Sequence, residues 1–135
     1  MAGYSGTPLV RKLGVKPGAR VCVLKPPPGF LASLGELAPG ARVVAASRRP
    51  ADVILFFTRR RSELERRLPG LKSRLDPAGG LWIAWPKRAS GVATDLSEDV
   101  VRGLALAARL VDNKACAIDE IWSGLRPGRA PTRPS

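Results

Sequence analysis

The chain has 135 residues, and its 23 lysines and arginines outnumber its 11 aspartates and glutamates, which gives a formal charge of +12. It contains no histidine, which excludes a Ser-His-Asp triad, a Cys-His dyad and an imidazole metal site. With 44% hydrophobic residues, the composition is that of one globular domain rather than of a disordered chain. We expect that domain to span residues 1–125, and a disordered basic tail rich in proline and arginine to span 126–135.

The cysteines and the apolar runs indicate where in the cell the protein is expected. Cys22 and Cys116 each lie in a short apolar run and not in a CxxC pair, which predicts buried thiols rather than a disulfide or metal ligands. The first residues lack the apolar core of a signal peptide, and no apolar run approaches the roughly 20 residues that cross a bilayer. We therefore expect a cytoplasmic protein with no membrane partner. No pattern identifies a cofactor, a metal or an oligomeric state.

The predicted elements alternate between helices and strands along the chain. Thr7 and Pro8 at the start and Gly14 after the end bracket a short helix. A second short helix is expected within 29–37, where apolar residues share one face before Pro39. Apolar and β-branched runs predict five strands, at 20–24, 41–47, 52–57, 81–85 and 114–118.

Two longer helical patterns lie in the third and fourth connections. The third opens with a capping-box pattern from Ser62 to Glu65, but Pro69 interrupts its leucine stripe. We therefore expect a kink, or two short helices that meet at Leu68. The fourth begins at Asp95, with a glutamate three residues later, and is expected to be the longest helix.

Strands that alternate with crossovers of this length predict an α/β fold. We expect a mainly parallel sheet of about five strands, with helices on both of its faces. The segment IWSGL after residue 120 is expected to add an antiparallel edge strand near the C-terminus.

Cations follow four of the predicted strands. Because the carboxyl ends of parallel strands meet at one edge, where open α/β sheets bind ligands, we expect these side chains to converge on an anion, together with helix N-termini. The alternative is that the arginines of this arginine-rich chain simply occupy exposed loops. The cations are Lys25 after the first strand, Arg48 and Arg49 after the second, Arg59, Arg60 and Arg61 after the third, and Lys87 and Arg88 after the fourth.

Two loops at this edge carry further expectations. The segment 25–29 reads KPPPG where nucleotide-binding folds place a glycine-rich loop. Its prolines lack the amide donors of a phosphate cradle, which argues for a rigid loop in which Gly29 allows close approach. The long loop 86–95 offers Ser90 and Asp95 as ligand contacts, although Asp95 also suits a helix cap. Trp85 beside it either stacks on a ring or packs in the core.

Four segments resemble the bacterial family called domain of unknown function 3052. They are GYSGTPLVRKLGVKPGARV from residue 3, PPGF from 27, GLWIAWPKRASGVATDLSEDVVR from 80 and LVDNKACAIDEIWSGL from 110. The resemblance covers residues 3 to about 125 and implies a small stand-alone bacterial protein without an assigned activity. Members of that family are expected to continue with a further apolar strand segment, where this chain turns into RPGRAPTRPS.

A more distant resemblance is to Rossmann-like methyltransferases. KLGVKPGARV, DVILFF and RLDPAGGLWIAW are similar to the N-terminal turn, a middle strand and the LxPGG-type turn of those enzymes. This implies a three-layer Rossmann-like domain. Those enzymes are most alike in a glycine-rich loop with a preceding acid after strand one and an acid that ends strand two and holds a ribose, where this chain has KPPPGF and ASRR. Arginines cannot accept ribose hydrogen bonds as a carboxylate does, so the resemblance supports the fold more than the activity.

Three hypotheses about function remain open. The first is a ligand-binding or interaction module that takes an anionic small molecule or a nucleotide at the cationic edge. The second is a diverged S-adenosylmethionine-dependent methyltransferase, and the third is nonspecific, charge-driven association with nucleic acid, for which no recognition motif is present. The sequence identifies no catalytic residue. The expected ligand contacts are Lys25, Arg48, Arg59, Arg60, Lys87, Arg88, Ser90 and Asp95.

Overall fold

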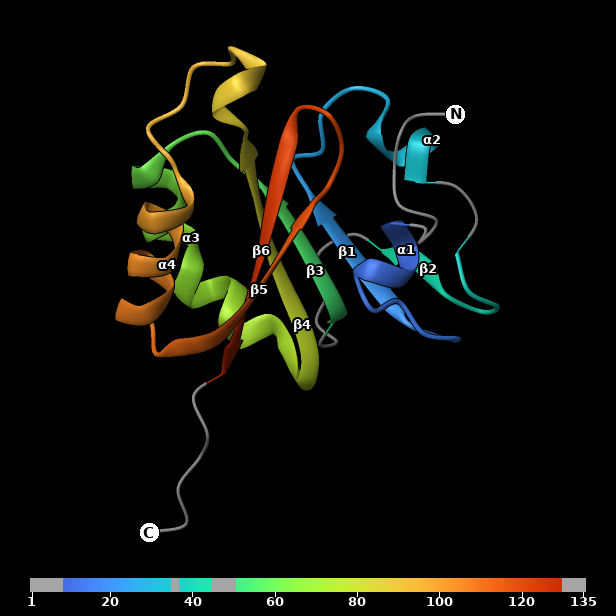
Figure 1. Cartoon of the computed structure of the whole chain (residues 1–135). Coiled ribbons are helices and arrows are strands. Elements are labelled where there is room, and N and C mark those ends of the chain that lie inside the picture. Colours follow the sequence, from blue (N-terminus) through green and yellow to red (C-terminus); the bar gives the residue numbers. More distant parts are fainter. Residues whose placement is uncertain (1–8, 35–36, 45–50, 130–135) are drawn as a thin grey trace, which may run out of the picture.

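The computed structural model describes residues 9–34, 37–44 and 51–129 of the chain. The strands are β1 Arg20–Leu24, β2 Arg42–Val44, β3 Ala51–Phe57, β4 Leu75–Pro86, β5 Leu110–Ala117 and β6 Trp122–Arg129, and the helices are α1 Leu9–Lys12, α2 Phe30–Leu34, α3 Arg61–Arg74 and α4 Glu98–Ala107, with a 3-10 turn, η1, at Arg88–Ser90. Within the described residues, six strands form one sheet in the order β2-β1-β3-β4-β6-β5 (Figure 1). The strands from β1 to β4 pair in parallel, whereas β6 pairs antiparallel with both β4 and β5.

Alternate residues of the central strand pack against opposite layers. Along β3, Val53, Leu55 and Phe57 belong to one core cluster, and Ile54 and Phe56 belong to the other. The first cluster contains the buried side chains of α1 and α2, and the second contains those of α3 and α4. Figure 1 shows these two pairs of helices on opposite sides of the sheet. The structure therefore confirms the α/β fold with helices on both faces of a mainly parallel sheet.

The order of the strands creates a crevice at the end of the sheet where β1 and β3 terminate. β1 lies between β2 and β3, so the chain moves to one side of β1 for the next strand and to its other side for the one after. Such a reversal leaves a crevice outside the carboxyl ends of the two strands concerned, here β1 and β3. These carboxyl ends point upward in Figure 1, toward η1 and α2.

Two predicted strands, 20–24 and 52–57, are confirmed as β1 and β3. β2 occupies three residues of the strand predicted at 41–47, whose last three residues lie outside the described part of the chain. β4 and β5 are longer than predicted, because their first residues, from Leu75 and Leu110, continue the pairing past an irregularity in register.

The C-terminal strand differs from its prediction in two respects. β6 is antiparallel, as expected, but it lies between β4 and β5 instead of at the edge of the sheet. It also includes residues 126–129, which the sequence predicts to be part of a disordered tail. The pairing with two neighbours explains the difference, since Leu125 is fully buried and Arg126 has a register partner in Lys114 of β5. Residues 130–135 lie outside the described part.

The long helix α3 decides against one of the two alternatives predicted for Pro69. It continues through Pro69 as one helix of 14 residues, and not as two short helices that meet at Leu68, while the kink stays a prediction. Pro69 is exposed, so the carbonyl group that loses its N–H partner there faces water, while Leu64, Leu68 and Leu71 stay buried on the other face.

The helix α4 begins later than predicted and is not the longest. It starts at Glu98, and Ser97 caps it by accepting a hydrogen bond from the Val100 amide at 3.2 Å. Asp95 lies two residues before this cap and performs a different role, described below. With 10 residues, α4 is shorter than α3.

The two short helices lie where the sequence predicts them. α1 falls within 7–14 and is followed by Gly14, whose φ of +81° ends it; Thr7 and Pro8 lie outside the described residues. α2 falls within 29–37 and follows Gly29, which also has a positive φ, of +80°.

Other observations restrict the chemistry that the domain offers. Cys22 is buried, as expected, whereas Cys116 is half-buried, and both are free. Burial raises the pKa of both thiols. In the described part of the chain, no three His, Cys, Asp or Glu side chains gather where they could hold a metal ion. Nor is any described helix long and apolar enough to cross a membrane.

Gly124 of β6 offers a test of the packing of β6 against Ile118 and Trp82. A Cβ atom added there would lie 2.7 Å from Ile118 Cδ1 and 3.4 Å from Trp82 Cε3. We predict that Gly124→Ala lowers the free energy of unfolding by about 1–3 kcal/mol, because overpacking forces buried side chains to move. Urea denaturation measures this change.

Gly103→Ala is the matched control, since Gly103 is exposed on α4 and an added Cβ meets no atom within 4 Å. This substitution should raise the free energy of unfolding by about 0.5–1 kcal/mol, because alanine favours the helix over the unfolded chain. Effects of the same sign at the two glycines would contradict the packing described for β6.

Candidate functional site

A cleft of about 520 Å³ opens at the carboxyl ends of β1 and β3, in the crevice that the reversal of strand order creates. It is formed by the loop after β1, the end of β3, the first turns of α3, the loop before α4 and the start of β6. Its lining residues are Lys25, Pro27, Pro28, Phe57, Thr58, Arg59, Arg60, Ser62, Glu63, Arg66, Val92 and Trp122.

Three side chains connect β1, β3 and α3 inside this cleft. Thr58, which follows β3, is only 3% exposed, and its Oγ1 donates a hydrogen bond of 2.6 Å to Glu63 Oε1. The other carboxylate oxygen of Glu63 forms an ion pair with Lys25 Nζ. Lys25 has a φ of +54°, a left-handed conformation that costs a non-glycine residue about 1–2 kcal/mol. This conformation turns the chain out of β1 at the cleft.

The surroundings of Glu63 determine its charge. Burial acts to raise the pKa of Glu63, but the hydrogen bonds from Lys25 and Thr58 and the charges of Lys25 and Arg66 outweigh burial and hold the pKa below its ordinary value. Glu63 is therefore ionised at neutral pH, and its low basicity makes it a weak general base. Its charge neutralises that of Lys25.

Three arginines, Arg59, Arg60 and Arg66, also line the cleft. In the part of the chain that the structure describes, none of them forms an ion pair with a carboxylate. All three are exposed, so their guanidinium groups are accessible to a ligand in the cleft. The net charge of the described lining is positive.

The loop before α4 holds the arginine segment in place. Thr94 Oγ1 donates a hydrogen bond of 2.7 Å to the Arg59 carbonyl oxygen. Asp95 Oδ1 accepts one of 2.7 Å from the Arg61 amide. Asp95 thus satisfies a free amide at the start of α3, and not of the helix that follows it in sequence. Residues 93–95 also border a second hollow beside the same arginine segment.

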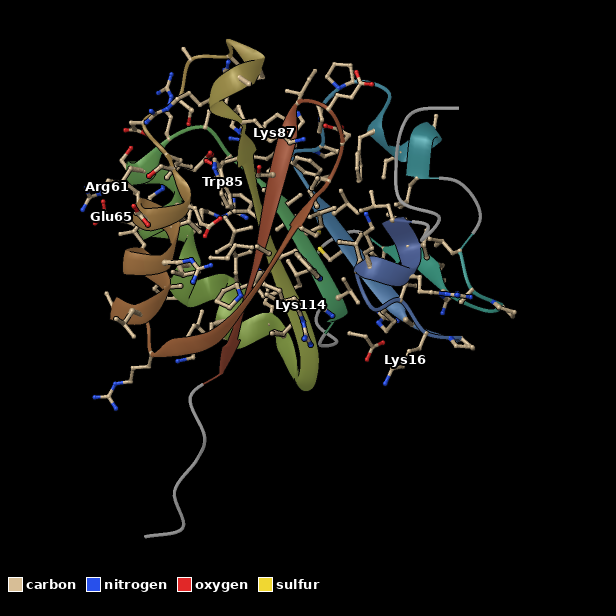
Figure 2. All side chains as sticks on the ribbon, in the orientation of Figure 1. Lys16, Arg61, Glu65, Trp85, Lys87 and Lys114 are labelled. Atoms are coloured by element: carbon tan, nitrogen blue, oxygen red, sulfur yellow. The ribbon has the colours of Figure 1, made fainter. Side chains whose placement is uncertain are left out.

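The structure brings some of the expected ligand contacts together. Lys25, Arg59 and Arg60 all line the cleft. Lys87 and Arg88 follow β4 at the same edge of the sheet but do not line the cleft, and Figure 2 places Lys87 at this upper edge.

The remaining expected contacts have other surroundings. Ser90 Oγ donates a hydrogen bond of 2.6 Å to the Lys87 carbonyl and accepts one of 3.2 Å from the Val92 amide, which closes the turn around η1. Asp95 caps α3, as described above. Arg48 lies outside the described residues, as does Arg49.

Most of the residues that line the cleft were not predicted as ligand contacts, among them Glu63, Arg66 and Trp122. Glu63 and Arg66 lie three residues apart on α3, and residues at this spacing share one face of a helix. That face borders the cleft. That spacing was the available signal. Trp122 reaches the cleft only because β6 lies between β4 and β5, and no local pattern reveals this pairing.

Two expectations about the cleft are resolved by the packing. Trp85, for which stacking and core packing were both open, is 5% exposed in the core, and Figure 2 shows it inside the domain. The tryptophan of the cleft is Trp122, whose ring lies edge-on to Phe57 with centroids 5.1 Å apart.

The expectation that Gly29 allows close approach is wrong. A Cβ added to Gly29 would meet no atom within 4 Å, so the positive φ of this residue, and not close approach, requires glycine there.

Solved structures with the same fold include S-adenosylmethionine-dependent methyltransferases. One from Aquifex aeolicus aligns over 88% of this chain and 86% of its own, with a TM-score of 0.65 and 18% identity. The ribosomal protein L11 methylase of Lactobacillus delbrueckii subsp. bulgaricus aligns over 91% and 75%, with a TM-score of 0.60 and 16% identity. Aeropyrum pernix fibrillarin with natively bound S-adenosyl-L-methionine aligns over 93% and 70%, with a TM-score of 0.58 and 15% identity.

At these identities the similarity shows the fold alone, and it confirms the expected likeness to the fold of Rossmann-like methyltransferases. The chain matches no family model and no curated protein sequence. The resemblance to domain of unknown function 3052 therefore stays a prediction.

Glu63 couples stability to pH. Its pKa is lower in the folded than in the unfolded chain, so its charge stabilises the protein above about pH 4.3, and this stabilisation is lost as the pH falls through the folded-state pKa. We predict that Glu63→Gln lowers the free energy of unfolding at neutral pH by about 1–3 kcal/mol, since Lys25 and Thr58 lose a charged acceptor. Urea denaturation at neutral pH and at about pH 3 should show a smaller difference in acid.

Glu65→Gln provides the control on the same helix. Glu65 pairs with Arg61 at 3.5 Å, and both side chains are more than half exposed, so the loss should stay below about 0.5 kcal/mol. A loss at Glu63 that is the same at both pH values would contradict the role given to its charge.

Proposed function

We propose that this protein binds an anionic small molecule, a nucleotide or another phosphorylated compound, in the cleft at the carboxyl ends of β1 and β3. One observation carries the proposal. The cleft is lined by Lys25, Arg59, Arg60 and Arg66 against a single described carboxylate, Glu63, which is already paired with Lys25. Three guanidinium groups therefore remain for a ligand, and guanidinium binds phosphate with paired N–H donors.

Apolar side chains share the cleft with these cations. Pro27, Pro28 and the half-buried Trp122 all line it. Proline rings and an indole offer flat apolar surfaces against which an aromatic ring packs well. A compound with both a nucleobase and phosphate groups uses both kinds of lining, which is why a nucleotide suits the cleft better than an inorganic anion.

The cleft fits S-adenosylmethionine poorly, although the fold is shared with enzymes that use it. That cofactor carries a positive sulfonium, which the cationic lining repels. Three prolines, at 26–28, remove amide donors from the loop after β1. The segment after β2, which lies outside the described residues, reads ASRR and contains no carboxylate for a ribose.

Thermal-shift titration with ATP and ADP at low salt tests the proposal. A ligand that binds only the folded state should raise the Tm by on the order of 10 °C at about 100 times its Kd. The double variant Arg60→Gln, Arg66→Gln should lose most of this increase, because it removes two of the three available guanidinium groups.

The matched control is Arg74→Gln, Arg102→Gln. It removes the same net charge from the last turn of α3 and from α4, and should retain the ligand-induced increase. Equal losses in the two variants would indicate a general charge effect and would rule out a site in the cleft.

The shared fold favours one alternative, a diverged S-adenosylmethionine-dependent methyltransferase. Isothermal titration calorimetry with S-adenosylmethionine and S-adenosylhomocysteine separates this alternative from the anion site. Binding with a Kd below about 1 mM would support the methyltransferase, particularly if it persists in Arg60→Gln, Arg66→Gln. We expect no binding, because the charge of the cleft opposes that of the cofactor.

A further inference from the structure

A separate hollow, of about 530 Å³, lies at the amino ends of β1 and β3, at the opposite end of these strands from the cleft. Val53 of β3 and Gly80 of β4, which are register partners, line it from the sheet. The turn that joins α1 to β1 lines one side, and Lys114 and Arg126 contribute from β5 and β6. Figure 2 places Lys16 and Lys114 in the lower half of the view and Lys87 near the top.

Two cations of this hollow face each other across the sheet. Lys114 and Arg126 are register partners on β5 and β6, and like charges directly opposite each other destabilise a strand pair. Neither has an ion-pair partner in the described part of the chain. The Arg126 side chain reaches over β4, where a Cβ added to Gly80 would lie 2.5 Å from Arg126 Nε. Glycine at position 80 thus makes room for a cation on the surface of the sheet.

The helix α1 and the turn after it add three further cations. Arg11, Lys12 and Lys16 line the hollow together with the two cations of β5 and β6. Its one described carboxylate is Asp52, whose Oδ2 accepts a hydrogen bond of 2.8 Å from the Arg20 amide. Five cations and one carboxylate leave an excess of four positive charges. Such a concentration of like charge is relieved when an anion binds among them.

We propose that this hollow is a second anion site and that it takes a compact compound with two or more phosphate groups. An excess of four charges, drawn from α1, β5 and β6, matches the charge of an oligophosphate rather than of a monocarboxylate. The hollow is bounded on two sides by the α1 turn and by β5 and β6, which suits a small ligand better than a continuous polymer. This inference is independent of the function proposed for the cleft.

Nuclear magnetic resonance with inorganic triphosphate provides a readout that is specific to this site. Gly80 lines the hollow, and the Trp82 indole N–H donates a hydrogen bond of 3.1 Å to the carbonyl of Leu13, another lining residue; the signals to follow are the Gly80 backbone amide and the Trp82 indole N–H. Both signals should shift with triphosphate at low salt, and their shifts give the Kd. In Lys16→Gln, Lys114→Gln we expect that Kd to rise by about tenfold or more, because two charged hydrogen-bond donors are lost.

The control is Arg60→Gln, Arg66→Gln, which removes the same net charge from the cleft at the opposite edge. It should change the Kd measured at Gly80 and Trp82 by less than about twofold. Without ligand, Lys16→Gln, Lys114→Gln should be at least as stable as the wild type, because it reduces repulsion within the hollow.

Three outcomes would overturn this inference without affecting the function proposed for the cleft. The first is that millimolar triphosphate does not shift Gly80 or Trp82. The second is that both double variants weaken binding at these signals equally. The third is that a single-stranded oligonucleotide shifts them and triphosphate does not, which would indicate a nucleic-acid backbone surface.

Discussion

β3 forms parallel pairs with β1 on one side and with β4 on the other, and its residues from Val53 to Phe57 are buried on both faces. Because these strands run in parallel, the residues that follow β1 and β3 emerge next to each other. Thr58 is consequently buried at the point where β3 ends, and a buried hydroxyl requires a hydrogen-bond partner. Glu63 on the next helix is that partner, and its second oxygen draws in Lys25. The cleft results from the position of β3 in the sheet and not from a local motif.

Local patterns in the sequence were sufficient for the parts of the fold that depend on local chemistry. Runs of β-branched residues predicted β1 and β3, and the rule that parallel strands end at one edge predicted that Lys25, Arg59 and Arg60 would gather. Contacts between distant residues could not be predicted in this way. Asp95 was assigned to the helix next to it in sequence, but it caps α3, which lies 34 residues earlier at Arg61. Likewise, the strand residues 126–129 resemble a tail by composition, and only their pairing with β5 orders them.

The comparison with methyltransferase structures separates fold from chemistry. The fold aligns with those domains over most of the chain, yet the cleft at the carboxyl ends of β1 and β3 is lined by more cations than carboxylates, and such a lining disfavours a positively charged sulfonium group. Cations gather at both ends of the strands, around the cleft and around the hollow beside β5. A strongly basic composition can arise without any binding function, and other cations, such as Arg74 on α3 and Arg102 on α4, lie away from both concave surfaces.

The position of β6 has a consequence for how the chain folds during synthesis. β5 pairs only with β6 among the described strands, and β6 alone attaches it to β4. While the ribosome is still making the residues after 117, β5 therefore has no strand beside it, and the edge of β4 that pairs with β6 has no partner. The nascent chain must wait for β6 to insert between β4 and β5, which are made before it. Until that insertion, it displays an unpaired edge of the kind that chaperones protect and that promotes aggregation.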